Sequence, residues 1–128
     1  MKILRIATSS REAMIDITDQ LAETAAEMTS GALLVYTPHT TTGLTINEGA
    51  DPDVRRDILA HLRAMIPRDG GFRHAEGNSD AHIKASLFGS SVHVIVENGR
   101  LALGAWQRVF LGEFDGPRTR EIWVQILS

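Results

Sequence analysis

The last third of the chain alternates apolar and polar residues, and this pattern constrains the fold more than any other feature. It runs through three stretches, "SVHVIVENGRLAL" (91–103), "WQRVFLGEF" (106–114) and "TREIWVQIL" (119–127). Such a period of two is typical of strands, whose successive side chains point to opposite faces of a sheet. Asn98-Gly99 favours the type I′ turn of a tight hairpin. We therefore predict a mainly antiparallel β core, with "DGPR" (115–118) joining the last two strands.

The first two thirds of the chain combine strands with helices. We predict strands over 2–8, 12–18, 32–37 and 43–47, with the second paired to the first, and helices over 16–31, 51–67 and 79–89. Thr18 is a natural N-cap for the first helix and Gly31 a natural end. Asp51 and Pro52 favour the start of the second. The prediction is a single α+β domain over 1–128, with a sandwich-like, mainly antiparallel core and two to three helices.

The second predicted helix carries an apolar stripe. Its members recur at helical spacing, so one face of the helix is expected to pack against the core. The stripe consists of Val54, Ile58, Leu62 and Met65.

Composition narrows the classes of function. The 128 residues carry a net charge of −3, and the arginines are interleaved with acids. Nucleic-acid binding needs a basic stripe, so we expect no nucleic-acid partner. No apolar run approaches the roughly 18 residues that span a bilayer, so no membrane association is expected. The chain has no cysteine, which excludes disulfides and thiolate ligands and makes the cytoplasm the expected location.

Three of the five histidines stand at element ends or in polar loops, where functional groups concentrate. His39 lies in "PHTTTGL" (38–44), and His74 and His82 bound "HAEGNSDAH" (74–82). Three neutral imidazoles can hold a zinc ion and leave one position open. We treat these three as candidate ligands of a divalent metal, zinc or magnesium, within one subunit or across an interface. The alternative is that they are unrelated surface residues.

The other two histidines have plainer interpretations. His61 lies beside the apolar stripe of the second helix and is expected at the surface. His93 alternates with valines and is expected to be a half-buried sheet residue.

Acidic residues lie close to the candidate histidines in the sequence. We take His39, Glu48 and His82 as candidate catalytic residues, because imidazole and carboxylate groups transfer protons near neutral pH. Glu76 and Asp80 flank His74 and His82. Asp80 can orient an imidazole, or it can simply favour the first turn of its helix.

Hydroxyl, amide and guanidinium groups suggest a phosphate site. The candidate substrate-binding residues are Thr40, Thr41, Asn78, Gln107 and Arg118. Backbone N–H groups at a strand end or a helix N-terminus bind anions, and a guanidinium grips phosphate through two hydrogen bonds. The threonines can equally begin a strand, and "DGPR" can be no more than a turn. Trp106 is expected in the core.

The chain resembles the YjbQ family over nearly its whole length. The family-like segments are "PHTTTGLTINEGADPDVRRD" (38–57), "HAEGNSDAHIKASLFGSS" (74–91) and "GRLALGAWQRVFLGEFDGPRTREI" (99–122). Ala105 replaces the threonine of the usual Gly-Thr-Trp-Gln signature, so any contribution of that hydroxyl is absent. The resemblance implies a homotrimer. It also implies a thiamin-phosphate synthase side activity, which joins a pyrimidine diphosphate to a thiazole phosphate and expels pyrophosphate.

Three hypotheses follow from these residues. The first is an enzyme, either metal-assisted or phosphate-ester-binding, that acts on a small phosphorylated molecule. The second is a non-catalytic trimeric module that binds a metal or a phosphoester. The third is a structural oligomer, which the density of polar residues in "HAEGNSDAH" disfavours. The chain has no Gly-x-Ser-x-Gly elbow, P-loop or dinucleotide fingerprint.

Overall fold

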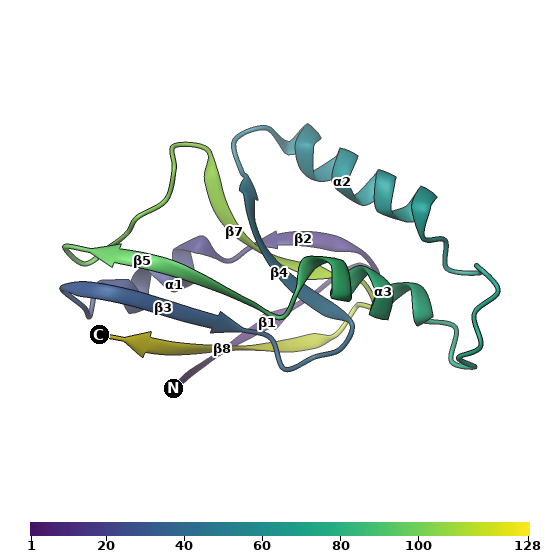
Figure 1. The fold of residues 1–128 in the computed structure, drawn as a ribbon, viewed down its shortest axis with the longest axis horizontal. Helices are drawn as coiled ribbons and strands as arrows, with labels where there is room; N and C mark the ends of the chain where they lie inside the picture. Colours follow the sequence, from purple (N-terminus) through teal and green to yellow (C-terminus); the bar gives the residue numbers. More distant parts are fainter.

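Two antiparallel sheets and three helices make up the computed structural model, which describes residues 1–128 (Figure 1). The elements in chain order are β1 (Lys2–Ala7), β2 (Ala13–Asp16), α1 (Thr18–Ala25), β3 (Ser30–Tyr36), β4 (Thr42–Glu48), α2 (Pro52–Met65), α3 (Ser79–Phe88), β5 (Ser91–Glu97), β6 (Arg100–Leu101), β7 (Gln107–Glu113) and β8 (Thr119–Leu127). The predicted α+β class with a mainly antiparallel core is confirmed.

The larger sheet has the strand order β1-β8-β3-β5-β6. β3 lies between β5 and β8, with Val35 opposite Val92 on one side and Val124 on the other. The predicted hairpin joins β5 to β6. Asn98 and Gly99 have φ angles of 52° and 73°, the positive values that a type I′ turn requires at both central positions.

The smaller sheet has the order β2-β7-β4 and corrects two predictions. β2 pairs with β7 and not with β1, because the chain changes sheets between the first two strands. β7 and β8 belong to different sheets, so residues 115–118 form a crossover between the sheets and not a hairpin turn. Alternation alone identifies strands but carries no information on which strands pair.

The core lies between the inner faces of the two sheets and is closed by α1. Its buried apolar side chains come from both sheets and from that helix: Ile6, Ile17, Leu21, Ala25, Leu33, Val35, Leu44, Val94, Val96, Val109, Leu111, Ile122 and Val124. Each fully buried Val, Leu or Ile contributes about 1.5–3 kcal/mol. A second cluster joins α2 and α3 to Phe114 at the end of β7. This cluster fixes α3 beside the smaller sheet.

The helix ends match the sequence only in part. Asp51 caps α2 as predicted, accepting a hydrogen bond from the Asp53 N–H at 2.9 Å. Met65, predicted as the last residue of the apolar stripe, is exposed. Ile66, the next residue, is buried in its place. α1 begins at Thr18 and ends at Ala25, well before Gly31, which lies in β3. The Thr18 hydroxyl accepts from the Val109 N–H, so it ties the helix to β7 and does not cap it.

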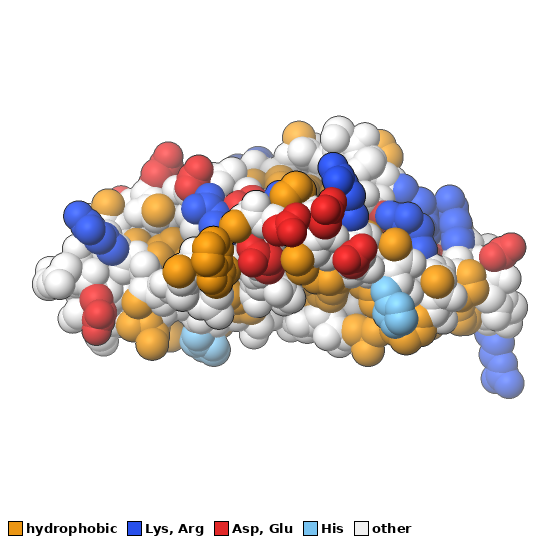
Figure 2. Space-filling view, turned by 90° about the horizontal axis from the view of Figure 1, so that it is seen from above, with side chains coloured by type: hydrophobic (Ala, Val, Ile, Leu, Met, Phe, Trp, Pro, Cys, Tyr) orange, Lys and Arg blue, Asp and Glu red, His pale blue; other side chains and the backbone are white.

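The outer face of the larger sheet carries exposed apolar side chains, and we call it the open face. Its members include Ile3, Tyr36, Ile95 and Leu127. Tyr36 stacks on Trp123 with ring centroids 5.8 Å apart. The face drawn in Figure 2 also carries apolar side chains, and its basic side chains stand in separate groups with acidic ones between them. None of the helices combines the length and apolar content needed to cross a membrane.

Candidate functional site

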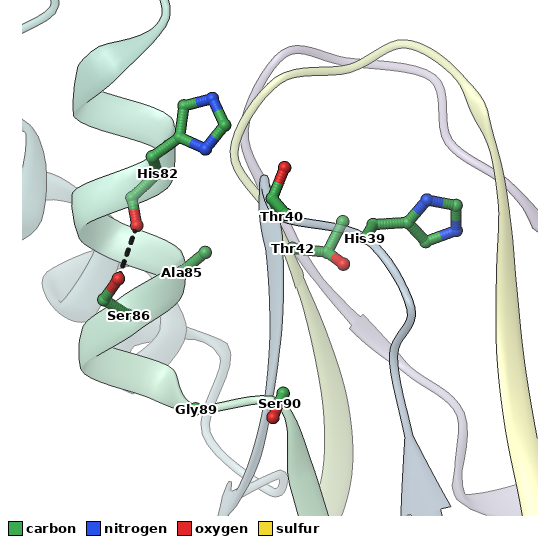
Figure 3. Close-up of a pocket in the computed structure, with 8 residues that line it drawn as sticks. All are labelled: His39, Thr40, Thr42, His82, Ala85, Ser86, Gly89 and Ser90. Atoms are coloured by element: carbon green, nitrogen blue, oxygen red, sulfur yellow. Dashed lines mark hydrogen bonds between the residues drawn. The ribbon is translucent and has the colours of Figure 1, made fainter.

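Two adjoining depressions lie between the start of β4 and the helix α3. The first has a volume of about 560 Å³ and the second about 340 Å³. Both are lined by His39, Thr40 and His82, so they form one continuous surface feature. Figure 3 draws the residues that line the first depression. The first continues along α3 to Ser86 and Ser90, and the second is lined further by Pro38, Thr41, Glu76, Asn78, Asp115, Arg118 and Arg120.

The close approach of α3 to the smaller sheet forms one wall of this feature and depends on two glycines. A Cβ atom added to Gly43 would lie 2.4 Å from the Phe88 Cβ atom. One added to Gly112 would lie 2.7 Å from the Phe88 ring. Any side chain at these positions would force the helix away from the sheet. The glycine that ends "HTTTG" is therefore a packing requirement.

The three consecutive threonines have three different environments. Thr40 is exposed and lines both depressions. The buried Thr41 hydroxyl accepts a hydrogen bond from Arg120 Nη2 at 2.8 Å, which leaves its own proton free to donate. The Thr42 hydroxyl bonds to that of Thr37 at 2.6 Å. Of the two predicted substrate-binding threonines, Thr40 is open to a ligand and Thr41 is held by the protein.

His39 turns its side chain away from His82 and toward β8 (Figure 3). Its Nε2 atom accepts a hydrogen bond from the Glu121 N–H at 2.9 Å, so the ring proton of the neutral form is on Nδ1. Burial lowers the pKa of His39, and the nearby Arg120 cation lowers it further. The neutral imidazole therefore links the 37–41 segment to β8, and the lone pair on Nε2 is not available to a metal in this arrangement.

His74 and His82 lie next to each other. Their rings meet edge to face with centroids 5.7 Å apart, and His74 Nε2 is 3.7 Å from a Glu76 carboxylate oxygen. His39 does not join them, and within the chain no three histidine or carboxylate groups are placed to hold a metal ion. One subunit thus brings together two of the three predicted ligands.

Glu48 and Gln107 lie at the opposite end of the smaller sheet. In the β4–β7 pair, Thr42 is opposite Glu113 and Glu48 is opposite Gln107. We call the first pair of positions the site end and the second the far end. Six residues separate them, which is about 20 Å along a strand. The structure therefore does not bring Glu48 or Gln107 to the depressions.

Both far-end side chains have local partners instead. Glu48 accepts from the backbone N–H groups of Ala50 and Asp51, just before α2. Gln107 accepts from the Gly104 N–H within its own turn. Two neighbours share this end: Ala105 is exposed, and Trp106 is 66% exposed, so the prediction of a core tryptophan is wrong. The Ala105 position is thus remote from the depressions.

The two remaining histidines, His61 and His93, are both exposed. His61 is exposed on α2, as predicted. His93 is exposed on the outer side of β5 and is not half-buried. Its place on the open face explains the difference, since no second layer covers that side of the sheet in the chain.

Asn78 and Arg118 reach the second depression through Asp115. The Asn78 amide donates to Asp115 Oδ2 at 2.9 Å, and Arg118 Nη2 donates to the same oxygen at 2.9 Å. Arg118 also donates from Nε to the Asp115 carbonyl oxygen. Its side chain is 54% exposed. Two of the Arg118 nitrogens therefore stabilise the 115–118 crossover and are less available to bind a ligand.

The buried pair Arg120 and Glu113 was missed by the sequence analysis. Their side chains are 4% and 0% exposed, and Arg120 donates to both carboxylate oxygens of Glu113. Thr8 donates to the same carboxylate at 2.7 Å. One signal was present in the sequence: Arg120 shares the inward-facing parity of β8 with Ile122 and Val124, where a charged residue is unusual.

Asp80 has a structural role that the sequence left open. It is fully buried and lies between Lys84 and Arg11, with bonds of 2.8 Å and 3.0–3.1 Å. Burial alone would raise the pKa of Asp80, but these hydrogen bonds outweigh it and hold the pKa below its usual value. Asp80 therefore anchors α3 to the 11–12 segment and orients no imidazole.

The fold and the site define a class of protein, a single-domain α+β sandwich with a polar depression beside its third helix. The sequence matches, over residues 2–128, the profile of the family described as UPF0047 protein YjbQ-like. The chain belongs to this YjbQ family.

Relatives from distant organisms share most of the chain. UPF0047 protein YugU of Bacillus subtilis is 51% identical, covering 100% of this chain and 99% of its own. UPF0047 protein MJ1081 of Methanocaldococcus jannaschii is 48% identical, covering 97% and 91%. A crystal structure of an uncharacterized conserved YjbQ/UPF0047 protein from Clostridium acetobutylicum superposes with a TM-score of 0.97 at 49% identity, covering 99% of this chain and 100% of that one. Conserved hypothetical protein TT1486 of Thermus thermophilus gives 0.94 at 44%, with the same coverage.

Proposed function

We propose that this chain is a small-molecule enzyme that binds a phosphorylated substrate in the two joined depressions. One observation carries the proposal. Thr40, Asn78, His82 and two arginines, Arg118 and Arg120, come from three separate segments of the chain, and all five line the second depression. Imidazole, hydroxyl, amide and guanidinium groups line it together, the mixture that binds phosphate and moves protons.

His82 is the proposed proton-transfer residue. The His82 ring lies beside the space that both depressions share. The neighbouring Ser86 hydroxyl donates to the backbone carbonyl of His82 and not to its ring. The imidazole is therefore free to protonate a leaving oxygen or to take a proton from an attacking group. In the thiamin-phosphate synthase side activity that the family resemblance implies, the leaving group is pyrophosphate, and Thr40 and Asn78 would donate to its oxygens. His39 supports the loop in its neutral form, and we assign no role to Glu48 or Gln107.

A divalent metal, zinc or magnesium, remains part of the proposal only for the assembled protein. His74 and His82 supply two adjacent imidazoles, but the chain completes no three-ligand set. A third ligand would have to come from a neighbouring subunit. Elemental analysis of the purified, assembled protein tests this directly: bound metal would support a third ligand from a neighbouring subunit, and its absence would remove the metal from the proposal.

We also propose that the chain forms a homotrimer through its open face. The support is the set of exposed apolar side chains on β1, β3, β5 and β8, and the shallow hollow among Met1, Leu34, Tyr36 and Trp123. An isolated sheet face of this composition favours burial against another protein surface. Light scattering should give about three times the chain mass of 14.0 kDa, and a monomer at micromolar concentration would contradict the proposal.

Turnover separates the enzyme from a non-catalytic phosphoester-binding module. Wild-type protein is incubated with the pyrimidine diphosphate and the thiazole phosphate, and pyrophosphate release is followed. We expect release above the protein-free rate, abolished by His82→Ala and unchanged by Gln107→Ala at the far end. Binding of pyrophosphate without turnover would favour the module. Equal turnover in His82→Ala and wild type would remove His82 from the mechanism.

A further inference from the structure

Arg120 is a buried cation on the floor of the second depression. Its side chain is 4% exposed, and it is among the residues that line this depression. It is held there by β8, on which it shares the inward-facing side with the core residue Ile122. Charged side chains are rarely this deeply buried unless they are paired or bind a ligand.

The pairing of Arg120 uses three of its five N–H donors. Nε and Nη2 donate to the two oxygens of Glu113, and Nη2 also donates to the Thr41 hydroxyl. Both donors on Nη1 make no hydrogen bond within the chain. Nη1 is not among the buried unpartnered atoms, so it is the part of the guanidinium that is open to the depression.

The neighbouring groups determine what can bind at Nη1. Glu113 balances the Arg120 charge, while Glu76 and Asp115 bring negative charge to the same depression and Arg118 brings positive charge. These five groups together carry one net negative charge, so an anion is held there by directed hydrogen bonds and not by net charge. Asn78 Oδ1 is also buried without a partner, so it can accept from a ligand hydroxyl or N–H group.

We propose that Arg120 Nη1, and not Arg118, is the main anchor for the phosphate group of the substrate. The inference rests on the proposed phosphate-binding function and assigns its key cation. A guanidinium fixed on two sides is already oriented, so it loses little conformational entropy when it binds. Arg118 instead braces the crossover through Asp115 and stays half-exposed to solvent.

The test measures pyrophosphate binding by calorimetry with the assembled wild-type protein and matched variants. Arg120→Lys keeps a cation for Glu113 but removes the donors at Nη1, and we expect its affinity to fall at least about tenfold, as for loss of a charge-assisted hydrogen bond. Arg118→Gln should change the affinity by less than about threefold, the range of an exposed ion pair. Circular dichroism and thermal unfolding verify that each variant is folded.

Each of three outcomes would overturn a different part of the proposal. If wild type binds neither pyrophosphate nor phosphate, the proposed function itself fails. If wild type binds but Arg120→Lys binds equally well while Arg118→Gln does not, phosphate binding stands and the assignment to Arg120 fails. If acetate displaces pyrophosphate at equal concentration, the site recognises carboxylates and not phosphates.

A second variant covers the case in which Arg120→Lys does not fold. The double variant Glu113→Gln with Arg120→Gln replaces the buried ion pair by two amides that can hydrogen-bond each other. It also lacks the Nη1 donors, so the same loss of at least about tenfold is expected. Retained wild-type affinity in this variant contradicts the proposal.

Discussion

The two ends of the β4–β7 strand pair are similarly polar in sequence but have very different surroundings in the structure. Both ends are polar, and residues at both attracted functional predictions. At the site end, Glu113 and Thr41 bind Arg120 from a different sheet, and α3 packs against the strands. At the far end, Glu48 and Gln107 bond to backbone groups two or three residues away.

The difference teaches how to separate a site from a turn. Side chains with local partners stabilise the loop that carries them, and they need no distant element. Other side chains form hydrogen bonds with residues 70 or more positions away in the sequence, as Arg120 does with Thr41. Such hydrogen bonds form only where several segments of the chain meet. Only the second arrangement builds a depression with a fixed interior.

The largest expected difference between the ends is in stability. Arg120→Ala leaves the fully buried Glu113 carboxylate without its cation, and we expect a loss of about 3–5 kcal/mol in the free energy of unfolding. Glu48→Gln at the far end keeps the shape of the side chain and should cost less than about 1 kcal/mol. Urea unfolding of both variants measures the difference. Equal losses would show that the buried pair is not a special feature of the site end.

A smaller difference is expected from the glycines. Gly43→Ala places a methyl group 2.4 Å from the Phe88 Cβ atom and should cost about 1–3 kcal/mol, because two packed elements must separate. Gly104→Ala at the far end meets only the flexible Gln107 amide, at 3.2 Å. Its effect should stay within about 0.5 kcal/mol. Thermal unfolding compares the two, and a Gly43→Ala protein as stable as wild type would refute the close-packing argument.

The sequence predicted local features well and pairings poorly. The Asp51 cap and the Asn98-Gly99 turn depend on neighbours in the chain, so residue types were enough to predict them. The pairing of β2 with β7 and the exposure of Trp106 depend on topology, which alternation does not encode.

The candidate site divides in the same way. His39, Thr40 and His82 were predicted because they stand in polar loops or at element ends, and all three line both depressions, although the His39 ring is directed toward β8. The ion pair of Arg120 was not predicted, because the inward-facing position of Arg120 in β8 indicates only burial, and its partner Glu113 lies in the other sheet.

The smallest expected difference is in pH dependence. Burial and Arg120 lower the pKa of folded His39, so the unfolded chain binds a proton more readily at this residue. The contribution of neutral His39 to the free energy of unfolding is therefore fully present above the unfolded-state pKa near 6.5, and it is lost as pH falls toward the folded-state pKa. His39→Gln preserves an acceptor for the Glu121 N–H but does not titrate.

Urea unfolding at pH 7.5 and pH 5.5 checks this expectation. Wild type should lose more stability than His39→Gln between the two values. The same loss in both proteins would mean that the His39 imidazole is not the group responsible.

Chemical-shift mapping tests the central claim most directly, because it observes both ends of the β4–β7 pair in one experiment. Amide and arginine side-chain resonances are recorded while pyrophosphate is added to the assembled protein. We predict saturable changes at residues 39–41, 78–82 and 115–120, with the Arg120 side chain among the largest, and none at Glu48 or Gln107. Changes centred on the far end, or spread evenly over the surface, would contradict the account.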